Sequence, residues 1–236
     1  PGTKFIHYNL VSDLKKITKN TAAVILETIQ GGAGFIVPKD GYLKKVKQRC
    51  EEVGALLIVD EIQTGIGRTG KFWGFEHFKI IPDIIISGKG LGGGMPIGAF
   101  IAQKKLMDVL KEHPTLGHIT TFGGHPVIAS AGVATVNTIQ NSTLIEDTLE
   151  KEQLIRSLLK HPLIKEIRGK GLMLAALVES PEIAAKIIHR CLANGLILFF
   201  LLFEGRAIRI TPPLTISKKE ISKGCKILLE ILDELS

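Results

Sequence analysis

Short, continuously apolar runs alternate with polar, periodic segments in the first half of the chain. Four such runs predict buried β-strands, at residues 22–27, 55–60, 83–87 and 97–102. Apolar runs without a polar face are typical of strands that helices cover on both sides. Between the first two runs, Leu43, Val46 and Cys50 recur at helical spacing, with Asp40 as the predicted N-cap and Gly54 as the stop. Strand, helix and strand in this order predict a right-handed βαβ unit.

The pattern of apolar and polar residues changes after Pro126. Helical periodicity predicts helices at residues 127–140, 144–160, 181–194 and 218–235. Short runs between them predict antiparallel strands at residues 164–168, 172–178, 196–203 and 207–211. This mixture is typical of an α+β domain. We therefore predict an α/β chain in which residues 1–140 form a large domain with a mostly parallel sheet and residues 141–236 form a smaller α+β domain.

The composition of the chain bears on whether it binds nucleic acids or membranes. The 236 residues carry 30 basic and 23 acidic side chains, a formal charge of +7. The cations are scattered in pairs such as Lys15–Lys16, without a basic stripe interleaved with aromatics, so we expect no nucleic-acid partner. The longest apolar run, residues 196–203, is too short to cross a bilayer, so we expect no membrane partner.

The three cysteines, Cys50, Cys191 and Cys225, lie far apart and show no CxxC spacing. Neither a disulfide framework nor a metal site is indicated, because both need closely spaced or even-numbered ligands. We expect a reducing compartment and a cytoplasmic protein.

Two motifs carry the candidate chemistry. The first is Asp60-Glu61-Ile62-Gln63-Thr64-Gly65, which places Asp60 at the carboxyl end of a predicted strand, where open α/β sheets bind their ligands. A carboxylate there is costly unless a cation or a protonated nitrogen meets it. The alternatives are a helix cap and an ion pair with Arg68.

The second motif runs from Ser87 to Pro96 and sets Lys89 among glycines, directly after a predicted strand. A partly desolvated lysine has a lowered proton affinity, which suits a Schiff base. Glycines also cradle phosphates, but Lys89 precedes the glycine run, whereas a P-loop lysine follows it, and no GxGxxG opens a helix here. A phosphate- or nucleotide-binding protein remains an alternative to a Schiff-base enzyme.

The motifs at residues 60–65, 67–70, 82–84 and 88–90, in this order, resemble those of the class III aminotransferases. This fold-type-I group, which depends on pyridoxal 5'-phosphate, includes ornithine, acetylornithine and 4-aminobutyrate aminotransferases. The resemblance extends from Pro1-Gly2 to Pro212-Pro213. It implies an enzyme that transfers an amino group between an amino acid, ornithine-like, acetylornithine-like or another ω-amino compound, and a 2-oxo acid.

The resemblance also implies roles for the residues of both motifs. Lys89 would hold the cofactor as a Schiff base and then act as general acid and base. Asp60 would keep the pyridine nitrogen protonated, so that the ring serves as an electron sink. Ile62 would pack on one face of the ring, and Gln63 would hydrogen-bond its 3-oxygen.

Three further residues match family positions. Thr121 would bind the cofactor phosphate of a neighbouring subunit, which implies a homodimer with shared active sites. Arg209 would receive a substrate carboxylate, a task that suits the bidentate geometry of guanidinium. Glu27 matches a glutamate near the site, although a structural ion pair explains it equally well.

The chain departs from the family pattern in two respects. Gly32 stands where ornithine-type members carry a glutamate that masks the substrate arginine, so Arg209 is expected to stay exposed. No Gly-rich phosphate loop and no ring-stacking aromatic residue are found before Lys89, so we expect an N-terminally truncated chain that binds the cofactor weakly by itself. A decarboxylase or a racemase of the same family, and a non-catalytic fragment acting as a dimerisation or interaction module, remain alternatives.

Overall fold

The computed structural model describes residues 2–112, 114–115 and 117–236; Pro1, where the resemblance begins, lies outside them. The contacts divide the chain into two compact units. The first comprises residues 1–28, 38–66 and 75–141, and the second comprises residues 29–37, 67–74 and 142–236. Two short segments from the early part of the sequence therefore belong to the second unit.

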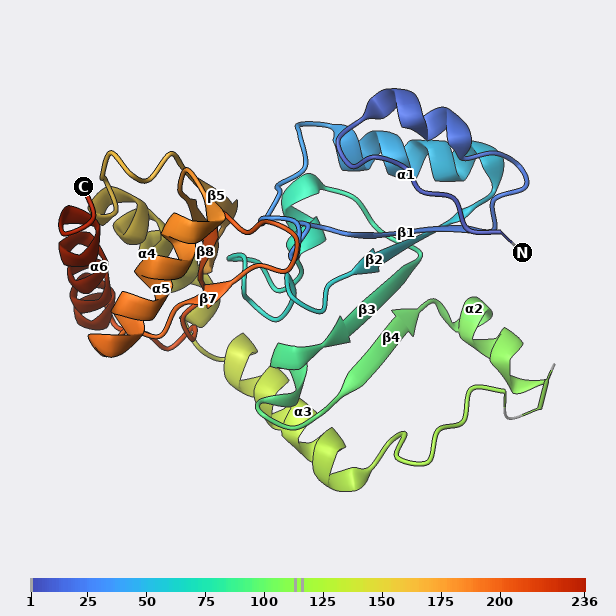
Figure 1. Cartoon of the computed structure of the whole chain (residues 1–236). Helices are drawn as coiled ribbons and strands as arrows, with labels where there is room; N and C mark the ends of the chain where they lie inside the picture. Colours follow the sequence, from blue (N-terminus) through green and yellow to red (C-terminus); the bar gives the residue numbers. More distant parts are fainter. Residues whose placement is uncertain (1, 113, 116) are drawn as a thin grey trace. The chain divides into compact units, whose positions relative to one another are not determined.

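A four-stranded sheet forms the centre of the first unit (Figure 1). Its strands lie in the order β1 (Ala23–Glu27), β2 (Leu56–Asp60), β3 (Ile84–Gly88) and β4 (Gly98–Ala102). The first three strands are parallel, and β4 runs antiparallel to β3. The predicted, mostly parallel sheet is thus confirmed, and the helix α1 (Tyr42–Val53) connects β1 to β2 as predicted.

Helix α1 begins one residue later than Asp40 would require. Its N-cap is Gly41, which has a φ of 75°, and the amide of Tyr42 donates to the carbonyl of Lys39 at 3.0 Å. The prediction of Asp40 as N-cap is therefore wrong, because a tight turn through a left-handed glycine opens the helix. Gly54, with a φ of 77°, ends α1 as predicted. The other elements of this part of the chain are η1 (Val11–Lys16), η2 (Gly74–Phe78), η3 (Lys89–Gly92), α2 (Lys104–Asp108), η4 (Val109–Lys111) and α3 (Pro126–Gln140).

The two faces of this sheet differ in burial. Val24, Leu57 and Val59 are buried on one face, where α1 packs against β2. Ile25 points to the other face and is 62% exposed, and Phe100 is 47% exposed. Coverage of these strands by helices on both sides, as the apolar runs predicted, is therefore not what the described residues show, because no helix among them buries Ile25.

An antiparallel sheet forms the centre of the second unit. Its order is β5 (Glu166–Lys170), β6 (Met173–Leu177), β8 (Ala207–Ile210) and β7 (Phe199–Phe200). Strand β7 has two residues, whereas the apolar run predicted a strand over residues 196–203. The chain leaves the sheet early because the amide of Phe203 donates to the carbonyl of Gly32 at 2.9 Å, outside the ladder.

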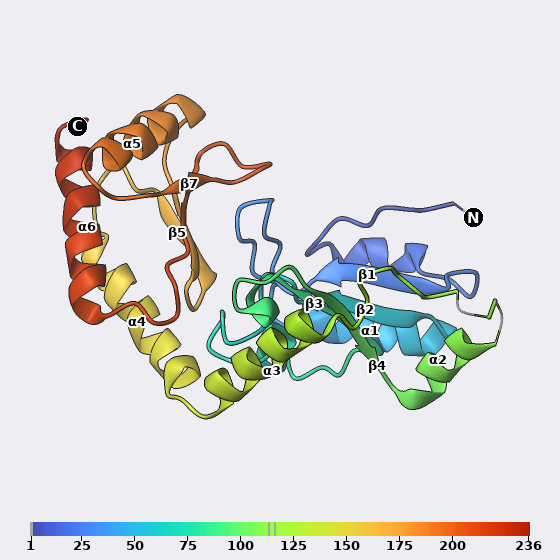
Figure 2. The same ribbon diagram turned by 90° about the horizontal axis from the view of Figure 1, so that it is seen from below.

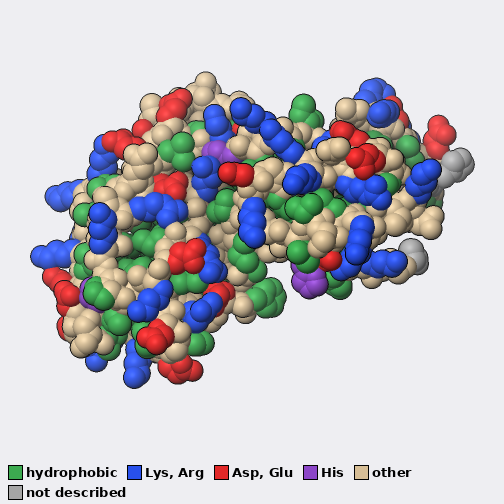
Figure 3. Space-filling model, turned by 90° about the horizontal axis from the view of Figure 1, so that it is seen from above, with side chains coloured by type: hydrophobic (Ala, Val, Ile, Leu, Met, Phe, Trp, Pro, Cys, Tyr) green, Lys and Arg blue, Asp and Glu red, His purple; other side chains and the backbone are tan. Residues whose placement is uncertain are grey.

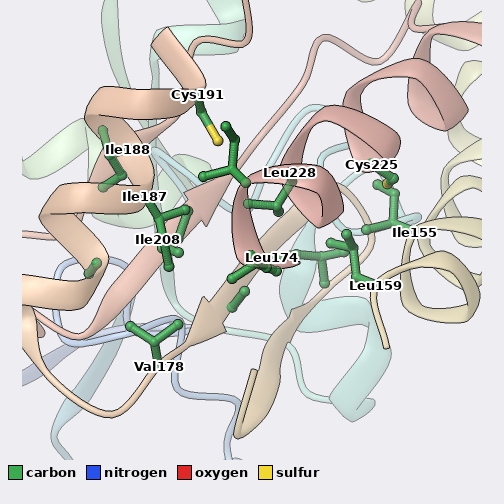
Figure 4. Packing of buried hydrophobic residues seen from close by; sticks show 14 of the residues in the cluster. Ile155, Leu159, Leu174, Val178, Ile187, Ile188, Cys191, Ile208, Cys225 and Leu228 are labelled. Carbon is green, nitrogen blue, oxygen red and sulfur yellow. The ribbon is translucent and has the colours of Figure 1, made fainter. Parts of the chain in front are cut away.

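Three helices cover one face of the second sheet: α4 (Leu144–Leu158), α5 (Pro181–Ala193) and α6 (Lys218–Asp233). Helix α6 contacts both α4 and α5 (Figure 2). Leu174 and Ile208 point from the strands into the core that these helices close, and Figure 4 shows the aliphatic side chains meeting there. Met173 and Ala207 point to the opposite face, where they pack with Ile29 and Phe35.

Charged side chains of both signs lie on the face drawn in Figure 3. On the face drawn in Figure 3, basic side chains lie among acidic and apolar ones without forming one continuous stripe. None of the helices in the described part of the chain has the length and apolar character needed to span a membrane.

Candidate active site

Three parallel strands end at the same edge of the first sheet, and the predicted site residues of the first unit follow from these ends. Strand β1 ends at Glu27 and β2 at Asp60, and the two residues are directly paired in the ladder. On its other side, Asp60 pairs with Ile86 of β3, and β3 continues to Gly88, immediately before Lys89. Two carboxylates and one amine therefore lie on neighbouring strand ends, where open α/β sheets bind ligands.

Lys89 has an unusual backbone conformation. Its φ is 40°, in the left-handed region that residues other than glycine seldom adopt. Strain of this kind persists where the surrounding structure imposes it, and it concentrates at functional sites. The side chain is exposed and forms no hydrogen bond or ion pair with the residues described here, so its amine is accessible to a reactant.

Gly88 allows a close approach beside Lys89. A Cβ atom at position 88 would lie 3.1 Å from the carbonyl oxygen of Ile97 and 3.7 Å from two side-chain carbons of Ile62. The side chain of Ile62 therefore packs over the backbone that leads into Lys89. A side chain at position 88 would be crowded against the carbonyl of Ile97, which would have to shift by a few tenths of an ångström, whereas Ile62 would lie at ordinary contact distance.

The turn after β2 holds Asp60 in place. Its Oδ1 atom accepts a hydrogen bond of 2.9 Å from the amide of Ile62, and Asp60, Ile62 and Gln63 are all half-buried. Since Ile62 also contacts Gly88, the structure brings Asp60, Ile62 and Lys89 together. Gln63 follows on the same turn, and Glu27 lies beside Asp60 on the neighbouring strand.

A buried carboxylate next to Asp60 was not identified from the sequence. Glu61 is 0% exposed. Its Oε1 atom accepts hydrogen bonds from the hydroxyl of Thr28 and, at 2.9 Å, from the amide of Phe75, and its Oε2 atom accepts one of 2.7 Å from the hydroxyl of Thr64. Glu61 thus fastens the end of β1 to the turn that follows β2. Successive residues of an extended chain point their side chains to opposite faces of the sheet. This alternation could have indicated from the sequence that Glu61 and Asp60 lie in different surroundings.

An aromatic pair supports the end of β1. The hydroxyl of Tyr8 donates to the carbonyl of Thr28 at 2.7 Å, and its ring meets that of Tyr42 edge-on at 5.2 Å. Burial, followed by the neighbouring Tyr42 and Glu27, raises the pKa of Tyr8 well above its usual range. Tyr8 is therefore a neutral donor that fixes the backbone next to Glu27.

The two remaining predicted residues lie elsewhere. Thr121 is exposed on the turn that precedes α3, and not at a strand end. Arg209 belongs to the second unit, on β8, where its Nε atom donates to the hydroxyl of Thr211 at 2.9 Å. Among the described residues, no group of three or more His, Cys, Asp or Glu side chains is arranged to hold a metal ion.

Comparison with known proteins places this chain in a family. The model of the family Aminotransferase class-III matches residues 3–232. A putrescine aminotransferase of Pectobacterium atrosepticum is 41% identical over 233 residues, which cover 96% of this chain and 50% of that protein. An acetylornithine aminotransferase of Caldanaerobacter subterraneus subsp. tengcongensis is 38% identical over 240 residues, which cover 99% of this chain and 59% of that protein.

Solved structures of aminotransferases are also similar to this chain. An ornithine aminotransferase from Toxoplasma gondii, whose active site held PLP at partial occupancy, superposes with a TM-score of 0.92 and 34% identity over 99% of this chain and 56% of its own. An acetylornithine aminotransferase from Elizabethkingia anophelis gives a TM-score of 0.89 and 36% identity over 97% of this chain and 59% of its own. The chain therefore has the fold of these enzymes and spans between half and three fifths of the length of the two curated relatives.

Proposed function

This chain belongs to the class-III aminotransferases, and on that premise we propose that it forms the lysine-bearing part of an enzyme that transfers amino groups with the help of pyridoxal 5'-phosphate. The observation that carries the proposal is the grouping of Lys89, Asp60 and Ile62 at the carboxyl edge of the first sheet. A strained, accessible lysine beside a carboxylate at a strand end suits covalent attachment of a carbonyl compound.

The residues present fit the cofactor. Asp60 uses one oxygen to accept from the amide of Ile62, and its second oxygen is left to meet the protonated pyridine nitrogen. Ile62 would offer an apolar surface to one face of the ring, and the side chain of Gln63, the next residue on the turn, would hydrogen-bond the ring's 3-oxygen. When bound, pyridoxal phosphate supplies an electron sink that stabilises negative charge on the amino-bearing carbon of the substrate.

The residues of the chain then divide the remaining work. Lys89 Nζ would hold the cofactor covalently, and the same amine would take a proton from the substrate carbon and return it. Asp60 would keep the pyridine nitrogen protonated, because a carboxylate beside it favours the cationic form. Arg209 receives a substrate carboxylate, and Glu27 lies beside Asp60 as a candidate for contact with the substrate amine.

For the substrates, we propose an amino donor of the ornithine, acetylornithine or ω-amino type and a 2-oxo acid acceptor. The names of the relatives support this class, since they act on putrescine, acetylornithine and ornithine. The residue at position 32 bears on whether Arg209 is free to bind a substrate carboxylate. This residue is glycine, and a Cβ atom at its position would lie 3.1 Å from the ring of Phe203. Gly32 has no side chain that could mask Arg209, and a larger residue there would need the ring of Phe203 to shift by a few tenths of an ångström.

We also propose a homodimer in which Thr121 of one subunit binds the cofactor phosphate of the other. Thr121 is exposed, and the neighbouring Phe122 is 74% exposed. An accessible hydroxyl beside an exposed aromatic ring suits a surface that a second subunit covers. A cytoplasmic location remains our proposal, supported by three buried cysteines that are all free.

Borohydride trapping tests the proposed role of Lys89. The full chain is incubated with pyridoxal phosphate, reduced with borohydride, and digested for peptide mapping, a procedure that also detects weak binding. We expect the cofactor label to be concentrated on Lys89, to vanish from that peptide in Lys89→Ala, and to fall in Asp60→Asn. Lys105→Ala, which removes another exposed lysine, is the control and should keep the label on Lys89. Equal labelling of Lys89 and the surface lysines would refute the assignment.

A further inference from the structure

Arg68 is held in a defined position in the second unit. Its Nη1 atom donates to the carbonyl of Pro212 at 2.6 Å and to the carbonyl of Leu172 at 3.1 Å. The amide of Leu172 donates back to the carbonyl of Arg68 at 3.0 Å. Arg68 therefore ties the segment 67–74 both to the start of β6 and to the chain that leaves β8, three residues after Arg209.

Arg209 points to the face of the second sheet that the helices do not cover. It pairs with Ala175 of β6 and with Phe199 of β7. Its neighbour Ile208 points into the core formed with α4, α5 and α6, so Arg209 points the opposite way, as Ala207 does. Only Thr211 accepts a hydrogen bond from its guanidinium among the described residues, and the other donors of the guanidinium are available to a ligand.

The two arginines share one electrostatic environment. Burial and, next, the positive charge of Arg209 lower the pKa of Arg68 to about 10. Within the described part of the chain, neither guanidinium forms an ion pair with a carboxylate. Two half-buried cations without a counter-ion raise the free energy of the folded protein, and a bound anion relieves this cost.

We propose that Arg68 is a positioning residue for the substrate carboxylate, which Arg209 contacts directly. The carbonyl bond of Arg68 to Pro212 fixes the segment that follows Arg209, and the positive charge of Arg68, which interacts with that of Arg209, strengthens the attraction for an anion bound at Arg209. The ligand class is the carboxylate of an amino acid or a 2-oxo acid. This inference rests on the proposed function, and it adds Arg68 to an arginine that the family resemblance had assigned alone.

Binding of glutarate, a carboxylate that cannot react, provides the test. The full chain is titrated with glutarate at low ionic strength and observed by NMR through the Nε–H signals of its arginines. We expect the wild-type chain to bind, Arg209→Gln to lose binding, and Arg68→Gln to bind about tenfold more weakly, as removal of one favourable charge interaction of moderate strength predicts. Lys71→Gln removes an exposed cation from the same segment and should stay within about twofold of wild type.

Arg68→Lys separates charge from structure. It keeps the cation and one donor nitrogen, so we expect glutarate affinity within about threefold of wild type and a salt dependence like that of wild type. Arg68→Gln, by contrast, should lower the salt dependence. If Arg68→Gln does not fold, as circular dichroism would show, Arg68→Lys decides: glutarate affinity within about threefold of wild type with an unchanged salt dependence supports the proposal, and a loss of about tenfold or more contradicts it. Wild-type affinity in Arg68→Gln, an equal loss in Lys71→Gln, or no binding of glutarate by the wild-type chain would overturn the proposal. Glutarate binding does not require the cofactor, so failure here is distinct from failure to trap it on Lys89.

Discussion

Removal of the Glu61 carboxylate provides a quantitative test of how the strand ends are held. Glu61 is fully buried and accepts from two hydroxyls and one amide, those of Thr28, Thr64 and Phe75. Glu61→Ala leaves these three donors buried without their acceptor. Each such donor costs about 1–3 kcal/mol when it loses its acceptor, so three of them cost at least about 3 kcal/mol. We therefore expect Glu61→Ala to lower the free energy of unfolding by about 4 kcal/mol.

Glu61→Gln distinguishes the loss of charge from the loss of shape. Glutamine keeps one oxygen for Thr28 and Phe75, and the hydroxyl of Thr64 can turn to accept from the new amide, so we expect a loss of about 1–2 kcal/mol. Urea unfolding followed by circular dichroism measures both variants. Glu52→Ala, on the exposed side of α1, is the control and should stay within about 0.5 kcal/mol of wild type. A cost below about 1 kcal/mol for Glu61→Ala, or equal costs for the two Glu61 variants, would refute this reasoning.

Two further predictions concern backbone and pH. Gly169 and Gly195 both have positive φ, but a Cβ at Gly169 would overlap the carbonyl of Met173, whereas Gly195 faces open space. Urea unfolding should show a loss of more than about 3 kcal/mol for Gly169→Ala and about 1 kcal/mol for Gly195→Ala, and equal losses would contradict this. Burial raises the pKa of Cys50, Cys191 and Cys225 from 9.0 to about 11. A raised pKa means that the folded state holds the thiol protons more tightly, so the contribution of the buried thiols to stability is fully present below pH 9 and is lost as the pH rises through 11. Replacing all three cysteines by alanine should therefore flatten the fall of the melting temperature between pH 9 and 11.

Local sequence patterns predicted the elements that local forces determine. The apolar run at residues 55–60 became β2 at residues 56–60, and the predicted helix at residues 181–194 became α5 at residues 181–193. Ser180 accepts from the amide of Ile183 at the start of that helix, which shows how a single polar side chain defines its beginning. Strand interiors and helix caps depend on a few consecutive residues, so they can be inferred without knowledge of the tertiary structure.

Features that depend on distant contacts could not be predicted in this way. Arg68 bonds Leu172, which lies 104 residues away, and contacts of this kind assign the segment 67–74 to the second unit. The apolar run 196–203 predicted a long strand, but the strand ends at Phe200, and the amide of Phe203 donates a hydrogen bond to the carbonyl of Gly32 instead of to the sheet. Apolar character predicts burial, whereas the partner that provides it is set by the fold.

The segment from Asp60 to Arg68 shows why a motif cannot be assigned one role. Asp60 and Glu61 are adjacent carboxylates, yet one ends a strand beside Lys89 and the other is buried among donors of the same unit. From Gly67 onward the chain belongs to the second unit, where the positive charge of Arg209 acts on Arg68. Substitutions along this stretch should therefore produce three separate effects: altered cofactor labelling at Asp60, altered stability at Glu61, and altered carboxylate affinity at Arg68. If all three changed the same property to the same extent, the motif would act as one structural unit, and the separate roles inferred from its contacts would be wrong.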